Sequence, residues 1–458
     1  MHADHDPWQT GLAAVDVLAV SAGGPQLLAQ RQRSRLMALL DAARAAPVYR
    51  ERLAGRRGEG LLDGIAPIGK RELMQHFETW VTDPALRLDA LQAFVADPSR
   101  IGEAFDGRFV VWESSGSSGE PGLFVQDARA MAVCDALEGL RRAPLNPWRR
   151  WFDPWCLAER IAFVGATTGH FASTVTLQRQ RRLQPGLAQR MQGFDFLQPL
   201  PELIAQLHRH APTVLATYPN AALLLAEEVR AGRLRLSLAE IWTGGESLTE
   251  AMRTEIEAAF GCPVANSYGA SEFLAIAAPC RLGVLHLNAD WVLLEPVDER
   301  GRAVPAGVCG ATTWLTNLAN HVQPLIRYDI GDRVTLHAQP CGCGSPLPAM
   351  EVLGRSDDML RLRDARGHRV LLPPLALVSV LEDAGVLDFQ LLQTGERSLR
   401  LHIGVGHAAH EAHRAMQALR EYLARQGLSD VRPLLRRGTT HHAGRSGKLQ
   451  RVMSQCER

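Results

Sequence analysis

Lysine is almost absent from this chain of 458 residues. Of its 50 basic residues only two are lysines, Lys70 and Lys448, and all the others are arginines. A preference of this kind is typical of a GC-rich genome and by itself indicates no function. Lys448, in "GRSGKLQRV" (444–452), is therefore an exception that needs a reason, whereas "PIGKREL" around Lys70 indicates a surface lysine without a chemical role.

The chain also lacks an excess of charge of either sign, because 50 basic and 49 acidic residues leave a net charge of +1. This balance excludes the extended basic surfaces that hold nucleic acids or anionic membranes. No apolar run reaches the ~18 residues of a membrane-spanning helix, and residues 1–12 do not have the pattern of a signal peptide. The 8 cysteines are too few for a disulfide scaffold. We therefore expect a reduced, cytoplasmic protein.

The length and the apolar pattern predict two domains of different size. Residues 1–100 have mainly helical periodicity, as in 31–53. From about residue 100, short apolar runs end in Gly/Ser-rich loops and alternate with helical segments. This alternation predicts a large α/β domain over residues 1–353, built from several subdomains with mostly parallel sheets.

The last hundred residues have a different pattern. "FQLLQTGERSLRLHIGV" (389–405) predicts a hairpin, 410–427 an amphipathic helix, and "VRPLLRRG" (431–438) a final strand. We expect a small, mobile α+β domain over residues 354–458, acting as a lid on the large domain.

Three polar loops follow apolar strands and contain groups that can bind a nucleotide. "ESSGSSGEPG" (113–122) has the backbone flexibility and the N–H and hydroxyl groups to wrap a polyphosphate, although it is not a Walker A loop. "NSYGASEF" (266–273) combines an aromatic ring, a hydroxyl and a carboxylate, and "RYDIGDRV" (327–334) adds Asp332. Taken singly, the three loops have plain alternatives: a linker, an ordinary strand-end turn and a solvated surface turn.

Taken together and in order, the motifs resemble those of the adenylate-forming superfamily, the acyl- and aryl-CoA ligases. "SSGSSGEP", "TGGES", "NSYGASE", "RYDIGD", "GRSDD" and "SGKLQR" span roughly residues 100–452, and "IRYDIGD" with "GRSDDML" resembles the phenylacetate-CoA ligase-like branch. The resemblance implies that ATP and Mg²⁺ activate a carboxylic acid as an acyl-adenylate with release of pyrophosphate. A thiol, usually that of coenzyme A, then displaces AMP to form a thioester.

The resemblance also implies a role for each residue of the motifs. The β- and γ-phosphates would be held by Ser114, Ser115, Gly116, Ser117, Ser118 and Gly119. The adenine would be lined by Gly245, Glu246, Ser247, Asn266, Tyr268 and Gly269. The remaining nucleotide contacts would be Ser271 to the α-phosphate, Glu272 to magnesium, Asp332 to the ribose and Arg355 to the ribose or phosphates.

Asp357 would be the hinge of the lid, and Lys448 the catalytic lysine. A compact ammonium can sit between two anionic reactants and neutralise their repulsion, which explains a lysine in an arginine-rich chain. Two departures from the family pattern are Glu120 and Gly122, and a carboxylate beside polyphosphate predicts modest ATP affinity. The segment after residue 360 is longer than in relatives, so coenzyme A contacts cannot be carried over.

Three cysteines and a histidine suggest a metal site. Cys280 and His286 are followed by Cys341 and Cys343, and a Cys₃His set suits structural zinc, with four ligands and no open position. Some members of the phenylacetate-CoA ligase-like branch carry such a site. The alternative is a group of reduced thiols beside an unrelated histidine.

The substrate and the acceptor stay open at this stage. Candidates for an acid pocket that suits an aromatic acid are His170, Phe171, Tyr218, Trp242 and Phe273, although His170 also suits a hydrogen-bonded core position. The acceptor is coenzyme A or the phosphopantetheine of a carrier protein. A non-catalytic nucleotide-binding protein is the third possibility, and a dimer is plausible.

Overall fold

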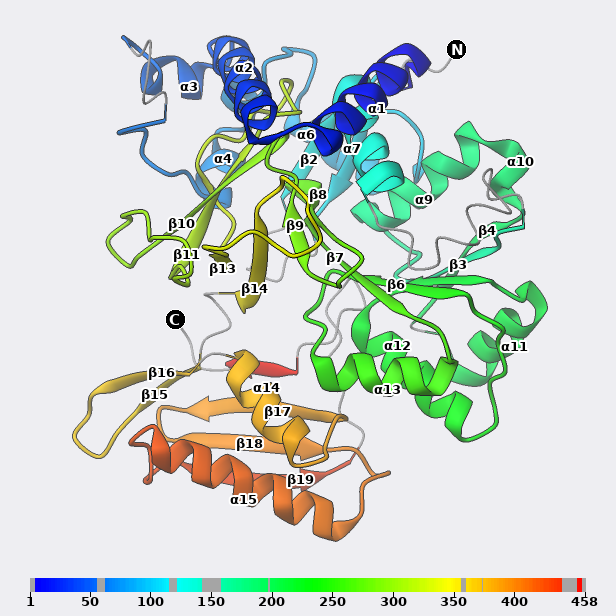
Figure 1. The fold of residues 1–458 in the computed structure, drawn as a ribbon, viewed down its shortest axis with the longest axis vertical. Coiled ribbons are helices and arrows are strands. Elements are labelled where there is room, and N and C mark those ends of the chain that lie inside the picture. The colour runs from blue at the N-terminus through cyan, green and yellow to red at the C-terminus, as the bar shows by residue number, and fades with distance from the viewer. Residues whose placement is uncertain are drawn as a thin grey trace.

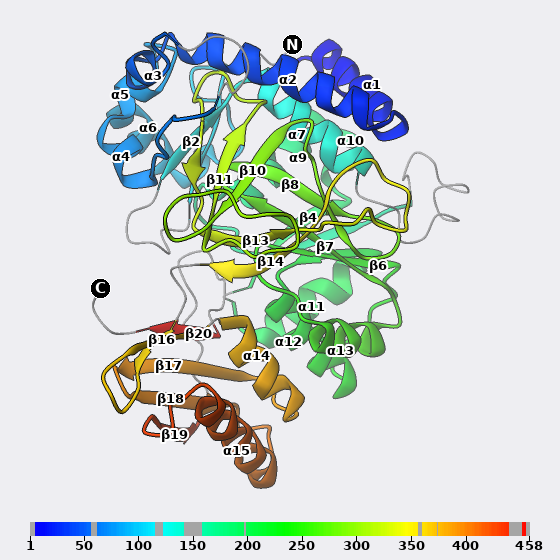
Figure 2. The same ribbon diagram turned by 60° about the vertical axis from the view of Figure 1, so that its left-hand side comes forward.

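The computed structural model describes residues 5–55, 62–114, 122–141, 158–196, 198–355, 360–372, 374–438 and 451–454. It contains a large unit and a smaller C-terminal unit, which lie at opposite ends of the molecule (Figures 1 and 2). Several predicted site residues lie outside the described residues: Ser115, Gly116, Ser117, Ser118, Gly119, Asp357 and Lys448.

The N-terminal hundred residues are helical and cover one end of the large unit. The helices are α1 (Pro7–Ala22), α2 (Pro25–Ala43), α3 (Pro47–Arg52), α4 (Lys70–Gln75), α5 (Phe77–Trp80), α6 (Leu88–Val95) and the 3₁₀ turn η1 (Pro98–Arg100). Proline occupies the first position of α1, α2 and α3, where its fixed φ suits a helix and its missing N–H costs nothing. Asp6 caps α1 by accepting a hydrogen bond of 2.9 Å from Trp8 N–H.

A nine-stranded sheet forms the centre of the large unit, in the order β13-β14-β9-β8-β7-β6-β5-β3-β4. Its strands are β3 (Ile161–Gly165), β4 (Met191–Asp195), β5 (Val214–Thr217), β6 (Glu240–Gly244), β7 (Val264–Ala270), β8 (Phe273–Pro279), β9 (Leu285–Leu287), β13 (Asp332–Leu336) and β14 (Ala349–Arg355). The helices in its parallel half are α9 (Ala172–Leu183), α10 (Pro185–Ala188), α11 (Leu200–His210), α12 (Pro219–Arg230) and α13 (Glu250–Phe260).

Parallel pairing is confined to one half of this sheet. Strands β4, β3, β5, β6 and β7 are parallel, whereas every pair from β7 to β13 is antiparallel. Residues 271–272, which join β7 to β8, are too few for a crossover connection, so these strands must pair as a hairpin. The predicted α/β class is confirmed, with the parallel part smaller than expected.

Two smaller antiparallel sheets complete the large unit. A hairpin of β1 (Val110–Glu113) and β2 (Leu123–Gln126) precedes α7 (Ala128–Arg141). The second sheet is formed by β10 (Val292–Val297), β11 (Thr312–Asn317) and β12 (Tyr328–Asp329).

The C-terminal unit has a sheet in the order β19-β18-β17-β20 and a hydrophobic core of its own, drawn from residues 360–452. Its elements are β15 (Leu360–Arg363), β16 (Arg369–Leu372), α14 (Pro374–Asp383), β17 (Phe389–Gly395), β18 (Ser398–Ile403), α15 (Ala409–Arg425), β19 (Arg432–Arg437) and β20 (Val452–Ser454). The predicted hairpin, helix and strand are all present. However, β19 is not the final strand, because β20 returns parallel to β17 through three residues that are too few to give a pattern. Among the described residues, no helix is long and apolar enough to cross a membrane.

Candidate active site

The carboxyl ends of β6 and β7 bring two of the predicted motifs together. These strands are parallel neighbours in which Thr243 pairs with Asn266 and Gly244 with Ser267. Thr243 Oγ1 donates a hydrogen bond of 3.0 Å to Asn266 Oδ1. Because parallel strands end at the same edge of a sheet, "TGGES" and "NSYGASE" lie side by side where ligands of α/β proteins bind.

Tyr268, Asp332 and Arg355 meet although they lie on three strands, β7, β13 and β14. Tyr268 Oη donates a hydrogen bond of 2.5 Å to Asp332 Oδ2, and Arg355 Nη1 lies 3.6 Å from Asp332 Oδ1. Burial, followed by the charge of Asp332, raises the pKa of Tyr268 well above its usual value, so the phenol stays a donor. The fold thus brings together the ring of Tyr268, the carboxylate of Asp332 and the guanidinium of Arg355, although Tyr268 and Arg355 are 87 positions apart in the sequence.

Glu272 is held by residues that the sequence analysis did not single out. Tyr328 Oη donates to Glu272 Oε1 at 2.7 Å, and Asn317 Nδ2 donates to the Glu272 carbonyl at 3.0 Å. Trp112 Nε1 donates to the carbonyl of the neighbouring Ser271 at 2.9 Å. The turn that carries the predicted phosphate and magnesium contacts is therefore fixed from β1, β11 and β12. For Tyr328 a signal existed, since it belongs to the "RYDIGD" motif.

Gly269 and Glu246, two residues of the predicted adenine site, also stabilise the local fold. A Cβ built on Gly269 would lie 1.9 Å from the carbonyl oxygen of Leu274, so no other residue fits in this hairpin. Glu246 Oε2 accepts hydrogen bonds from Asn220 N (3.2 Å) and Asn220 Nδ2 (2.8 Å) at the start of α12. Gly245 takes a positive φ of 76° and, like Ser247, is exposed.

The base of the predicted phosphate loop is closed by two hydrogen bonds. Ser114 N donates to the Gly122 carbonyl at 2.8 Å, and Gly122 N donates to Ser114 Oγ at 2.7 Å. A Cβ built on Gly122 would lie 3.0 Å from Cδ of Lys70, so the stem of this lysine packs against the loop base. Lys70 is half-buried, although the sequence analysis expects it simply at the surface.

Lys70 reaches this place through pairing of its own segment with the "RYDIGD" motif. Ile68 N donates to the Arg327 carbonyl at 3.1 Å, and Asp329 N donates to the Ile68 carbonyl at 2.9 Å. The segment of Lys70 is thus joined to a motif of the predicted nucleotide site by tertiary contacts, whereas Lys448 is assigned to that site by its own motif alone.

The predicted acid-pocket residues have mixed surroundings. His170 is fully buried, its ring lies 5.3 Å from that of Phe94, and burial lowers its pKa, so it has the environment of a core histidine. Phe273 belongs to the main hydrophobic core. Phe171, which pairs with Glu113, and Tyr218, which stands at the N-cap position of α12, follow the carboxyl ends of β3 and β5. Trp242 is half-buried on β6.

The predicted metal ligands converge. One ligand atom from each of Cys280, His286, Cys341 and Cys343 lies within 4.8 Å of all the others. His286 Nδ1 lies 2.8 Å from the Leu347 carbonyl, which fixes it as the donor, and Nε2 then faces Cys343 Sγ at 3.4 Å. The backbone N–H of Leu282 and that of Ser345 each donate to a cysteine sulfur at 3.4 Å. This donor set and its orienting hydrogen bonds fit a tetrahedral zinc ion.

Known proteins share both sequence and fold with this chain. No family model matches. Over 162 residues the chain is 36% identical to a phenylacetate-coenzyme A ligase of Thermus thermophilus, which covers 33% of the chain and 36% of the ligase. It is 30% identical over 165 residues to protein CapK of Staphylococcus aureus, covering 35% of each. The alignments therefore span only about a third of each of these relatives.

Solved structures match over nearly the whole length. A 2-hydroxyisobutyryl-CoA ligase with a bound acyl-AMP in the post-adenylation state has a TM-score of 0.63 at 20% identity, over 93% of this chain and 90% of that one. The chain has the fold of the acyl-CoA ligases. The anthranilate-CoA ligase AuaEII with anthranoyl-AMP has a TM-score of 0.52 at 17% identity, over 74% of this chain and 64% of that one. The predicted resemblance to the adenylate-forming superfamily is confirmed.

Proposed function

We propose that this protein is an AMP-forming acid–thiol ligase that activates a small carboxylic acid with ATP and transfers the acyl group to coenzyme A. The observation that carries the proposal is the convergence of Tyr268, Asp332 and Arg355 beside the Glu272 turn. Four side chains with complementary chemistry meet at one sheet edge, in a fold whose solved examples bind acyl-AMP. The partial identity to phenylacetate-CoA ligase supports the same activity and an aromatic acid.

The proposed roles follow from what each group can do. Asp332, oriented by Tyr268 and Arg355, accepts hydrogen bonds from the ribose hydroxyls, and the Tyr268 ring lies against the adenine. Glu272, oriented by Tyr328, would hold Mg²⁺, and the charge of this ion would offset that of the phosphates. Ser114 and the following loop hold the β- and γ-phosphates.

The reaction then proceeds in two displacement steps. A carboxylate oxygen attacks the α-phosphorus, the new C–O–P bond forms, and pyrophosphate leaves with the bonding electrons. In the second step the thiol sulfur attacks the acyl carbon, releases its proton to solvent, and AMP leaves. Lys448, assigned through the resemblance, neutralises the two anions in the first step. Asp357 is the proposed hinge at which the C-terminal unit turns between the steps.

The Cys₃His cluster is proposed as a structural zinc site. Four protein ligands leave no position for substrate, and the cluster joins the end of β8, β9 and the loop before β14. Metal analysis of freshly purified protein is expected to give about one equivalent of zinc, and Cys343→Ser to lower it at least about fivefold. Less than about a tenth of an equivalent in the unaltered protein would overturn this assignment.

The proposal is tested by acid-dependent ATP–pyrophosphate exchange without any thiol. Phenylacetate, benzoate, anthranilate and 2-hydroxyisobutyrate form the first panel, and Asp332→Ala is the matched inactive variant. We expect at least one acid to raise exchange about tenfold or more above the acid-free rate, and Asp332→Ala to abolish the increase. Lack of exchange with every acid, in protein that retains its fold, contradicts the proposal. Adding coenzyme A or a phosphopantetheinylated carrier protein then identifies the acceptor. Because the proposed reaction uses ATP and coenzyme A, we also propose that the protein acts in the cytoplasm.

A further inference from the structure

The outer face of α1 is an apolar surface without a partner among the described residues. Its members, here called the α1 stripe, are Trp8, Gly11, Leu12, Val15, Leu18, Ala19 and Ala22. At 100° per residue they fall within about 120° of the helix circumference. The exposed fractions are 82% for Trp8, 69% for Leu12, 67% for Val15 and 52% for Leu18. The opposite face, with Ala13, Val17 and Val20, is buried.

The α1 stripe differs from an ordinary solvent-facing helix surface, which is polar. The single charged residue of α1, Asp16, lies beside the stripe and forms ion pairs with Arg31 (2.9 Å) and with Arg35 of α2. Helix α1 contains no lysine or arginine. A helix that lies on an anionic membrane presents such cations beside its apolar face, so the composition of α1 favours a protein partner over a lipid surface.

The order of residues in the α1 stripe is self-complementary. If two copies of α1 pack antiparallel about a two-fold axis at Val15, Trp8 faces Ala22, and Leu12 and Leu18 lie at the same height on opposite flanks of the contact. Val15 then faces its own copy, and Gly11 and Ala19 lie about one turn from it on either side. The largest side chain thus lies opposite a methyl group, and the positions one turn from the axis are a glycine and an alanine, as a close helix–helix contact requires. A two-fold contact of this kind needs the same patch on both partners.

We propose that the α1 stripe is the core of a homodimer interface. The four large exposed side chains present on the order of 400–500 Å² of apolar surface per copy. This is about half of the ~800 Å² that each partner buries in a standard interface, so polar neighbours supply the rim and the dimer depends on concentration. α1 lies at the end of the molecule away from the C-terminal unit (Figures 1 and 2), so this dimer leaves that unit free to move. The inference does not depend on the proposed activity.

The test is the molar mass in solution, measured by light scattering and sedimentation between about 1 and 100 µM. We expect a concentration-dependent dimer, and the substitutions Leu12→Glu and Val15→Glu to raise its dissociation constant at least about tenfold. Val405→Glu is the matched control, because Val405 is equally exposed at 67% but lies in the C-terminal unit. Unchanged circular dichroism and melting temperature establish that each variant is folded.

A cysteine at the proposed axis tests the register independently. Val15→Cys is expected to form an intermolecular disulfide under mild oxidation, because the two copies of residue 15 would face each other. Val405→Cys and the unaltered protein, with its native thiols, are the controls. A monomer at every concentration, a dimer that Val15→Glu leaves unchanged, or binding of α1 to anionic vesicles instead would overturn the proposal.

Discussion

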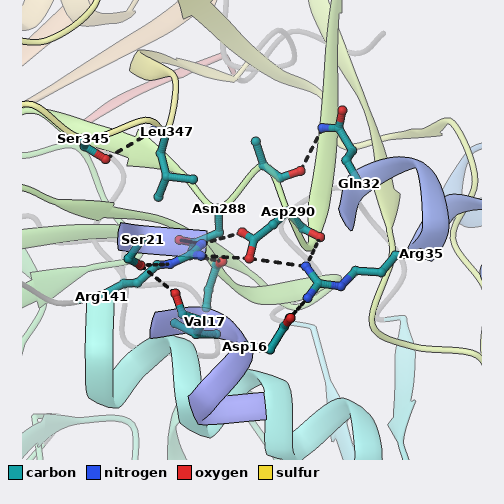
Figure 3. Close-up of polar contacts among 12 residues, drawn as sticks. Asp16, Val17, Ser21, Gln32, Arg35, Arg141, Asn288, Asp290, Ser345 and Leu347 are labelled. Atoms are coloured by element: carbon teal, nitrogen blue, oxygen red, sulfur yellow. Dashed lines mark hydrogen bonds and ion pairs between the residues drawn. The ribbon is translucent and has the colours of Figure 1, made fainter. Parts of the chain in front are cut away.

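Two buried ion clusters hold this molecule together, and they differ in what they join. Asp290 is fully buried and lies between two arginines (Figure 3). Arg141 Nη1 and Nη2 donate to its two carboxylate oxygens at 2.5 and 2.8 Å. Arg35 Nη1 donates to its carbonyl at 2.6 Å and lies 3.3 Å from Oδ2. With Asp16 on Arg35, the cluster joins α1, α2 and α7 to the segment before β10, all within the large unit.

The second cluster lies mainly within the C-terminal unit, and it also contacts the large unit. Arg451 Nη1 lies 2.5 Å from Glu382 Oε1, and Nη2 donates to the Leu387 carbonyl at 2.7 Å. Its guanidinium carbon lies 4.2 Å from the centre of the Phe389 ring. Its contacts with the large unit include Met252 Sδ of α13, 3.5 Å from Nη1, and Leu387 packs on the core of that unit.

The difference shows which contacts can separate at low cost. In the first cluster every charge depends on a partner from another element of the same unit, so no part can leave without exposing a buried ion. In the second, Glu382 and Leu387 stay with Arg451 when the units part, so the ion pair itself stays intact. What is lost is the weak sulfur acceptor, the nearby charge of Glu246 and the packing of Leu387 on the large unit. This is the arrangement that the proposed hinge at Asp357 requires.

Asp290→Ala should have the largest effect. It leaves Arg35 and Arg141 buried without their shared carboxylate, and burial already lowers the pKa of Arg35 to about 10. We expect the free energy of unfolding to fall by ~3–5 kcal/mol, measured by urea unfolding followed by fluorescence. A decrease in the free energy of unfolding of less than about 1 kcal/mol would show that the Asp290 cluster contributes little to stability.

Lys448→Ala should lower acid-dependent pyrophosphate exchange about a hundredfold, or ~2.7 kcal/mol of transition-state stabilisation. Thioester formation from a supplied acyl-adenylate should change less than about twofold, because the lysine acts only in the first step. Stability should not change, in contrast to Asp290→Ala. Equal loss in both half-reactions contradicts the assigned role.

Arg451→Met should have an intermediate effect. Arg451 is three residues after Lys448, so at ~3.5 Å per residue its anchor keeps the lysine within ~10 Å of a fixed point. We expect exchange to fall about tenfold, or ~1.4 kcal/mol, with a smaller loss in the thioester step. Arg451→Lys should recover part of the activity, which a purely structural role in the core does not predict.

Glu396→Gln is the matched surface control and should have the smallest effect. Its partner Arg363 lies 2.7 Å away, but the two side chains are 64% and 35% exposed. Exposed ion pairs contribute ~0–1 kcal/mol, so both unfolding and exchange should stay close to those of the unaltered protein. A large decrease in stability or in exchange for Glu396→Gln would contradict the expectation that exposed ion pairs contribute less than buried ones.

The sequence predicted those parts of the site that are encoded in short ordered segments. The loops after β1, β6 and β7 and the carboxylate of Asp332 were found because each combines apolar strand residues with a few polar groups at fixed spacing. The Cys₃His set was predicted because three cysteines and a histidine are a ligand combination that suits zinc. Lys70, Tyr328 and Trp112 were missed, since their contacts with the motifs are made between single residues that lie far apart in the sequence, as with the 159 positions between Trp112 and Ser271.

By itself the sequence determined the α/β class, the order of the motifs, the candidate metal-ligand set and the exception of Lys448, because these depend on composition and local spacing. Only the tertiary structure decided that Tyr268 donates a hydrogen bond to Asp332 and that Lys70 packs on Gly122. The same holds for the ion pairs of Asp290 with two arginines. The bond from Arg35 to Asp290 joins residues 255 positions apart. Such a pairing is selected by the packing of whole elements, which no periodicity in the sequence records.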